Sequence, residues 1–244
     1  MSVRPSALTV AAILAFGAGL AVASFAGFRE YLPELLRGMT VTVQIALGGA
    51  VLALVAAFVA ALCKLYAPPP LRWLASAYIE LFRGTSALVQ LFWLFFVLPH
   101  FGITLEPLSV GIRALGLNVG AYGAEVVRGA INGVARGQWE AATALNMSRG
   151  QTLRRIILPQ AIVAMIPPWG NLFIELLKAT SLVSLITLAD LTFKAQQINQ
   201  QTLRTAEIFT LVLLAYLALS VLITVGMRAL ERHMARGLRR GRTA

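Results

Sequence analysis

The sequence has few charged residues, one cysteine and two histidines. Of its 244 residues, 13% are charged and 58% are hydrophobic, whereas an ordinary soluble domain has about 25% charged residues. This composition argues against a soluble enzyme, and also against a disordered chain, which would be polar and rich in one charge sign. Cys63 alone forms no internal disulfide, and His100 and His233 are too far apart for a metal cluster. We therefore expect no metal and no cofactor.

Long apolar segments predict an all-α integral membrane protein. A helix that crosses a bilayer needs about 20 predominantly apolar residues. The sequence predicts six spans, which are Ala7–Phe28, Gly38–Cys63, Gly84–Leu98 (free of charge as far as Ile103), Pro107–Val127, Ala161–Leu177 and Ile208–Met227. A seventh apolar stretch, Ser181–Leu191, is too short to cross and is rich in hydroxyl groups. We expect it to be partly inserted or re-entrant and to line a wet region.

The net charge of +11 is explained by basic residues that gather on one side of the membrane. With six spans both termini lie on one side, and 15 of the 21 Lys and Arg residues then fall on that side, against five on the other. Cytoplasmic segments of membrane proteins carry such an excess of basic residues. We therefore place both termini in the cytoplasm and interpret the basic tail, residues 232–244, as a membrane-surface anchor rather than an arm that binds nucleic acid.

The first span has two interpretations. Arg4, an apolar core and small residues around Ala21-Val22-Ala23 resemble a signal peptide. The charge-free run of 22 residues is longer than the usual core of about 7–15 residues in a signal peptide. We favour a retained helix, and cleavage would leave the topology of the rest unchanged.

The cytoplasmic stretch Arg128–Pro159 does not have the composition of a simple linker. Residues 138–145 are good helix formers, and Trp139, Ala142 and Leu145 share one helical face. Asn146-Met147-Ser148 favours a turn, and Ser148 is suited to cap a second helix, Arg149–Leu158, which we expect Pro159 to interrupt. Physical arguments alone leave open whether this element binds a partner protein or lies on lipid headgroups.

The same stretch carries a recognisable motif. Glu140-Ala141-Ala142, followed by Ile156-Ile157-Leu158-Pro159, resembles the EAA loop of binding-protein-dependent ABC importer permeases of the type I fold. Further segments resemble the polar amino acid permease branch of that family, over roughly residues 36–231. They are Arg83-Gly84-Thr85, Val89-Gln90-Leu91-Phe92, Ala121-Tyr122, Ala124-Glu125, Arg128-Gly129-Ala130-Ile131, Gly137-Gln138-Trp139 and Leu177-Lys178-Ala179-Thr180-Ser181-Leu182.

The resemblance implies a permease with a five-helix core, to which residues 1–35 add one helix and an outer loop. Two permeases, identical or sister subunits, would form the pathway in the bacterial inner membrane. Two ATPase subunits would dock beneath them, and a periplasmic or lipid-anchored binding protein would deliver the solute. Residues 128–159 would be the coupling loop, with Glu140 making a polar contact to the ATPase while Ala141 and Ala142 keep the helix slim. The coupling set is Gly137, Glu140, Ala141, Ala142, Asn146, Leu158 and Pro159.

Two departures from the family pattern bear on the turn and on the solute. The family usually has glycine where this chain has Asn146, and asparagine tolerates the left-handed conformation better than most residues. Most polar amino acid permeases have aspartate where this chain has Ala179. Together with Ala144-Leu145-Asn146-Met147 and Leu185-Ile186-Thr187-Leu188, this resembles the ectoine and hydroxyectoine uptake permeases. Ectoine is therefore the favoured solute, with glutamine, arginine or histidine as the alternative.

Polar residues near the fifth span are the candidate solute pathway. The set is Asn171, Glu175, Lys178, Thr180, Ser181 and Ser184, and Pro167-Pro168 is expected to interrupt the backbone hydrogen bonds beside it. Glu175 and Lys178 are spaced to pair, either facing the solute or as an interfacial salt bridge. For Glu125 and Arg128, we expect an anchor above the coupling loop, and for Asn118 a structural hydrogen bond between helices.

Two other functional classes are less consistent with the sequence. A membrane enzyme would need a cluster of catalytic side chains, which the two separated histidines do not provide. A passive channel would leave the EAA-like loop without a role. Because no P-loop motif is present, we expect a transport subunit that is not itself an enzyme and that relies on a separate ATPase.

Overall fold

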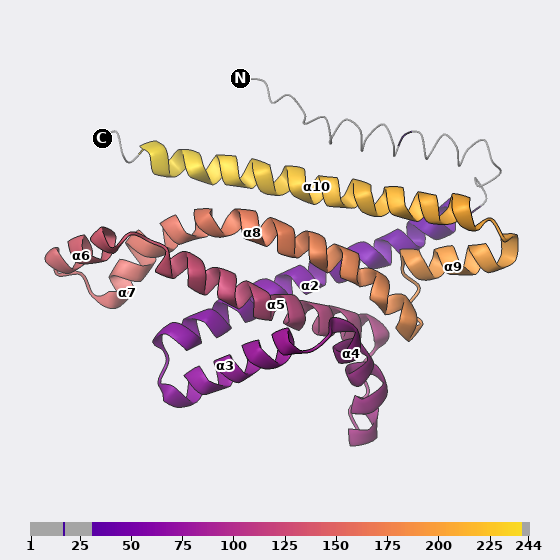
Figure 1. The fold of residues 1–244 in the computed structure, drawn as a ribbon, viewed down its shortest axis with the longest axis horizontal. Coiled ribbons are helices and arrows are strands. Elements are labelled where there is room, and N and C mark those ends of the chain that lie inside the picture. The colour runs from indigo at the N-terminus through magenta and orange to yellow at the C-terminus, as the bar shows by residue number, and fades with distance from the viewer. Residues whose placement is uncertain (1–16, 18–30, 241–244) are drawn as a thin grey trace. The chain divides into compact units, whose positions relative to one another are not determined.

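The computed structural model describes Gly17 and residues 31–240, and every regular element in this part of the chain is helical. The α-helices are α2 (Leu32–Tyr66), α3 (Pro69–Gly84), α4 (Ala87–Phe92), α5 (Pro107–Asn132), α6 (Arg136–Ala144), α7 (Arg149–Thr152), α8 (Leu158–Ala179), α9 (Leu191–Thr202) and α10 (Thr205–Arg240), as labelled in Figure 1. Two π-helical segments, η2 (Trp93–Val97) and η4 (Leu153–Ile157), and two 3-10 segments, η3 (Leu98–Phe101) and η5 (Thr180–Ile186), complete the set.

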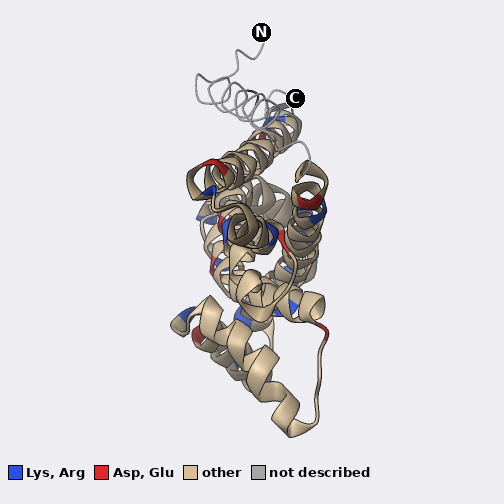
Figure 2. Cartoon of the chain, turned by 90° about the vertical axis from the view of Figure 1, so that its right-hand side faces the viewer, with Lys and Arg blue, Asp and Glu red and all other residues tan. Residues whose placement is uncertain are grey.

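Three helical stretches are long and apolar enough to cross a membrane, namely Leu32–Tyr66, Arg149–Ile186 and Thr205–Ala235. They contain the second, fifth and sixth predicted spans. The pair Pro69–Gly84 and Ala87–Phe101 adds a fourth when it is taken as one broken span. Figure 2 shows that charged residues are sparse over the described part of the chain as a whole. The first predicted span lies, apart from Gly17, outside the described residues.

Helix α5, the fourth predicted span, is continuous over 26 residues. It is not among the helices that are apolar enough to span by composition alone, because its glycines, Asn118 and charged residues lower its mean hydropathy. Helix α5 is therefore long enough to be the predicted fourth span, but it is less apolar than the other candidate spans. Polar positions in such a helix normally face neighbouring helices or a water-filled cavity rather than lipid.

The structure corrects four local expectations. Residues 69–84 form helix α3 rather than a cytoplasmic loop, and the third predicted span consists of short α, π and 3-10 pieces. Pro159 does not interrupt the helix: it is the second residue of α8, which continues directly from the π-helical segment η4 within one helical stretch, Arg149–Ile186. Helix α8 also continues through Pro167 and Pro168, although each lacks a backbone donor.

The chain forms two compact units, and α2, α5, α8 and α10 contribute residues to both. Among the described residues, unit 1 comprises 31–50, 87–116 and 173–224. Its core packs α9 on the first half of α10, which Figure 1 shows side by side. The buried side chains are Leu35, Leu191, Ala195, Ile198, Ile208, Val212 and Ala215. Leu203 ends α9 in the left-handed region, with φ of 56°, and its side chain is 83% exposed.

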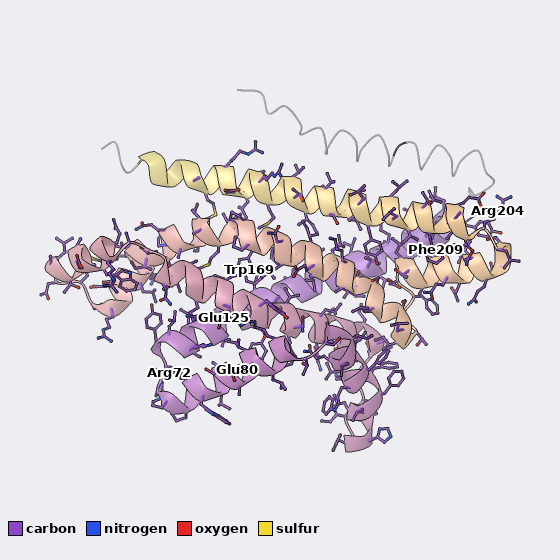
Figure 3. All side chains as sticks on the ribbon, viewed as in Figure 1. Arg72, Glu80, Glu125, Trp169, Arg204 and Phe209 are labelled. Atoms are coloured by element: carbon purple, nitrogen blue, oxygen red, sulfur yellow. The ribbon has the colours of Figure 1, made fainter. Side chains whose placement is uncertain are left out.

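Unit 2 comprises residues 51–86, 117–172 and the chain from 225 onward. Two glycines of α5 allow close helix contacts in this unit. A Cβ on Gly123 would lie 2.5 Å from Cη2 of Trp169, a residue of α8 labelled in Figure 3. A Cβ on Gly120 would lie 2.8 Å from the hydroxyl of Tyr78 on α3. Unit 2 therefore depends on small residues where its helices meet, as is common in membrane bundles.

Candidate coupling and solute-pathway sites

The predicted coupling loop is a structured element of unit 2. Helix α6 covers most of the segment predicted to be helical and contacts η4. Ala142, Thr152 and Ile157 are buried between these pieces. The Nε2 of Gln160 donates to Oε1 of Gln138 across 3.4 Å, which joins α6 to the start of α8. The loop therefore has an inner side that packs against its own chain.

The turn between α6 and α7 follows the sequence-based prediction. Asn146 has φ of 56°, in the left-handed region that asparagine tolerates. Ser148 caps α7: its hydroxyl accepts a hydrogen bond from the backbone N–H of Gln151 at 3.3 Å. The Gln151 side chain accepts one from the backbone N–H of Ser148 at 3.0 Å, which completes a capping box that the sequence analysis did not anticipate. These bonds fix the direction in which α6 and α7 leave the turn.

Most of the predicted coupling residues lie on the exposed side of this element. Gly137, Glu140, Ala141, Asn146 and Pro159 are exposed, and Leu158 is half-buried. Ala142 differs, because its side chain is fully buried within unit 2. The exposed side also includes Leu145, which is 73% exposed. The element therefore presents a carboxylate, small side chains and one leucine, a combination suited to a protein groove.

The predicted solute-pathway residues have two different environments. Asn171, in unit 2, and Glu175 and Lys178, in unit 1, are exposed on α8. Glu175 and Lys178 do not form the ion pair that their spacing suggested, although both are described. Exposed, uncompensated charges at the end of an apolar helix are available to a ligand or to a partner chain.

The three hydroxyl residues that follow are used within the chain. Thr180 is fully buried and donates to the carbonyl of Leu177 at 2.7 Å. Ser181 donates to the carbonyl of Lys178 at 2.8 Å, and Ser184 to that of Ser181, also at 2.8 Å. These bonds satisfy carbonyl groups where α8 tightens into the 3-10 segment η5, so the hydroxyl groups have a structural role in this conformation.

A buried polar cluster in unit 1 was missed in the sequence. Tyr216 of α10 places its hydroxyl 3.4 Å from that of Thr180 and 3.3 Å from that of Thr192. Asp190 is fully buried and accepts from the N–H of Phe193 at 2.9 Å, which caps α9. Thr42 of α2 accepts from the N–H of Leu191 at 3.2 Å. Burial raises the pKa of the Asp190 carboxyl above its ordinary value, and hydrogen bonds from Phe193 and Thr192 partly offset this.

A charged cluster in unit 2 confirms the predicted contact between Glu125 and Arg128 and enlarges it. The guanidinium of Arg128 donates to Oε2 of Glu125, with Nε at 2.9 Å. The ammonium of Lys64, at the end of α2, donates to Oε1 at 2.9 Å. One carboxylate thus bridges α2 and α5 shortly before the coupling loop. Lys64 was missed because it is 61 positions from Glu125.

Comparison with known proteins decides the family. The model of the family described as "binding-protein-dependent transport system inner membrane component" matches residues 49–236. This chain is a member of that family. It is accordingly a multi-pass permease of the inner membrane and not the ATPase subunit, and ATP hydrolysis belongs to a separate subunit.

Individual relatives cover most of the chain. The probable amino-acid ABC transporter permease protein y4tF of Sinorhizobium fredii (strain NBRC 101917 / NGR234) is 47% identical over 215 residues, covering 86% of this chain and 90% of that protein. The L-cystine transport system permease protein TcyB of Bacillus subtilis (strain 168) is 37% identical over 209 residues, covering 85% and 89%. A crystal structure of an amino acid ABC transporter with histidines superposes with a TM-score of 0.80 at 33% identity, covering 86% of this chain and 98% of that one.

Membership of this permease family confirms the predicted type I importer fold and explains the composition. No group of metal-binding side chains occurs among the described residues.

Proposed function

We propose that this chain is the permease subunit of an ABC importer for a polar amino acid. The observation that carries the proposal is the 47% identity over 215 residues to a probable amino-acid permease. Two further relatives support the same class of solute. They are the L-cystine permease protein and the solved structure of an amino acid transporter described above. The motifs that resemble ectoine permeases favour ectoine, but these comparisons give that solute no support.

The proposed assembly follows from the coupling loop. Two permease chains, identical or sister subunits, would form the pathway, and two ATPase subunits would dock on the exposed side of α6. A binding protein on the outer side, periplasmic or lipid-anchored, would deliver the amino acid. The ATPase would bias a two-state helix bundle between outward and inward access through α6. The exposed carboxylate of Glu140 and the buried residues on the inner side of the loop support this role.

For the solute pathway we propose Asn171, Glu175, Lys178 and Ser181, the members of the predicted set with exposed or partly exposed side chains. Thr180 and Ser184 are buried and support the same segment from within. The charges of Glu175 and Lys178 are opposite in sign, as are those of an amino acid at neutral pH.

The test is uptake by cells that express the complete system, including its ATPase and binding protein. Labelled cystine, glutamine, histidine, arginine and ectoine are offered separately, with Glu140→Ala as the uncoupled control. We expect at least one amino acid to accumulate in an ATP-dependent manner that ectoine does not inhibit. Accumulation of ectoine alone would overturn the amino acid assignment and restore the ectoine prediction, while leaving the permease role intact.

A further inference from the structure

Two opposite charges lie at the end of α3, where the sequence had predicted a loop. Glu80 and Arg83 are three residues apart, a spacing that places their side chains on neighbouring parts of one helical face, and both side chains are exposed. Figure 3 marks Glu80 on α3. Neither residue forms an ion pair with any side chain in the described part of the chain. The two charges therefore lie side by side and are available to a ligand.

If α3 crosses the bilayer as the first half of the broken span, both charges lie at membrane depth. Helix α3 begins at Pro69, after the end of α2 that the charge bias places in the cytoplasm. At a rise of about 1.5 Å per residue, Arg83 lies about 21 Å along the helix, within a hydrocarbon core about 30 Å thick. Ionisable side chains at such depth face water or protein rather than lipid, and they commonly mark solute pathways.

The guanidinium of Arg83 is held in place by α5. It lies 5.3 Å from the centre of the Tyr122 ring, within range of a cation–π interaction. The Tyr122 hydroxyl also donates to the backbone carbonyl of Arg83 at 3.4 Å. Because Tyr122 supports the guanidinium from its face, the N–H groups at its edge remain available to an anion.

The backbone that follows Arg83 leaves the helical conformation and is exposed. Helix α3 ends at Gly84, and Thr85 is extended, with φ of −120° and ψ of 153°. Residues 83–86 are all exposed. The last carbonyl groups of α3 are satisfied from nearby: Asn118 of α5 donates to Phe82 at 2.9 Å, and Thr85 donates to Leu81 at 2.8 Å. Non-helical backbone at membrane depth is tolerated where it is buried in protein or lines a water-filled cavity.

We propose that Glu80 and Arg83 form a subsite in the translocation pathway for the charged backbone groups of an amino acid. Arg83 would bind the α-carboxylate through its planar guanidinium, and Glu80 would accept hydrogen bonds from the α-ammonium group. This inference rests on the proposed function for the class of solute. Glu80 and Arg83 both lie within unit 2.

The experiment measures how Glu80 and Arg83 affect the reaction of charged reagents at the end of α3. It requires no knowledge of the transported amino acid. Cys63 is the only cysteine of this chain, so Cys63→Ser gives a permease without thiols into which Ser86→Cys is introduced, and labelling is read on the permease band alone. The complete transporter is placed in lipid nanodiscs, where both faces are accessible. Labelling rates are compared for a negatively charged sulfonatoethyl and a positively charged trimethylammonium-ethyl methanethiosulfonate reagent.

We expect Ser86→Cys to react and to favour the negative reagent. Arg83→Gln should lower the ratio of the two rates roughly fivefold, the order expected for one unit charge about 8 Å away in a partly aqueous site. Glu80→Gln should raise the ratio. The matched control is Leu74→Cys, which is 56% exposed and lies about 120° around α3 from Glu80. It should not react, because lipid covers that face.

A mixture of glutamine, histidine and arginine should slow labelling of Ser86→Cys, whereas sucrose at the same concentration should not. An unreactive Ser86→Cys in an assembled, ATP-hydrolysing transporter would overturn the subsite. So would an unchanged rate ratio in Arg83→Gln, or an unchanged rate in the amino acid mixture when the uptake panel has identified one of these three as a solute. The uptake panel tests the proposed function separately, because the charge dependence of labelling does not depend on which solute is transported.

Discussion

The coupling loop was selected from the sequence for its EAA-like motif and the end of α8 for its polar residues, and the two segments bury and expose different kinds of side chain. In the coupling loop the small residue Ala142 is buried and Glu140 is exposed. In η5, which follows α8, the polar residue Thr180 is buried whereas the apolar residue Leu185 is 50% exposed. Side-chain type alone therefore does not tell which of two polar segments meets a partner. The decisive fact is where each segment's own backbone groups find hydrogen bonds.

The largest expected effect is at the exposed side of the coupling loop. Glu140→Ala should leave an assembled complex in the membrane but abolish ATP-dependent uptake and most of the solute-stimulated ATP hydrolysis, because the change removes an exposed contact and no internal one. Both activities are measured in proteoliposomes. Glu106→Ala, which removes another exposed carboxylate outside the loop, is the control and should behave as the unchanged protein. Normal stimulation in Glu140→Ala would place the ATPase contact elsewhere.

An intermediate effect is expected at the charged cluster that joins α2 to α5. Glu125→Gln removes the charge shared by Lys64 and Arg128 and should destabilise the complex by about 1–3 kcal/mol, because two partly buried cations lose their hydrogen-bonded counter-charge. The readout is the temperature at which the purified transporter loses ATPase activity. Glu125→Asp keeps the charge and should recover most of the loss. If the two variants are equally unstable, side-chain length rather than charge holds this contact.

The smallest effects separate the two kinds of hydroxyl at the end of α8. Thr180→Val should cost about 1 kcal/mol of stability, because it removes the donor to the Leu177 carbonyl. Ser181→Leu changes a partly exposed position and should reduce uptake while the complex still assembles. Melting temperature and initial uptake rate are measured for both variants. A loss of uptake without loss of stability in Thr180→Val would show that the buried hydroxyl takes part in transport.

Local sequence signals predicted much of this molecule. The apolar runs in α2 and α10, the helix of the coupling loop, the left-handed Asn146 and the cap at Ser148 each depend on residues within a few positions. The contact between Glu125 and Arg128 also follows from helical spacing. In each case the physical cause lies within one or two turns of chain, so a single sequence contains it.

The features that were missed depend on contacts between distant segments. Lys64 meets Glu125 only because α2 packs on α5, and Asp190 is buried only because α2, α9 and α10 surround it. Helix α3 was taken for a loop because Arg72, Glu80 and Arg83 interrupt its apolar pattern. Charged residues on a helix that faces protein or water give the same sequence signal as a cytoplasmic connection.

The turn between α9 and α10 has a practical consequence for work on the intact transporter. Leu203 is a large apolar residue in a left-handed conformation, and its side chain is almost fully exposed. Replacement by glycine would relieve the strained backbone without removing a packing contact. Exposed turns of this kind also tolerate inserted residues better than the helices that they join. The Leu203 turn is therefore the place to attach an affinity tag or a fluorescent probe that leaves the bundle undisturbed.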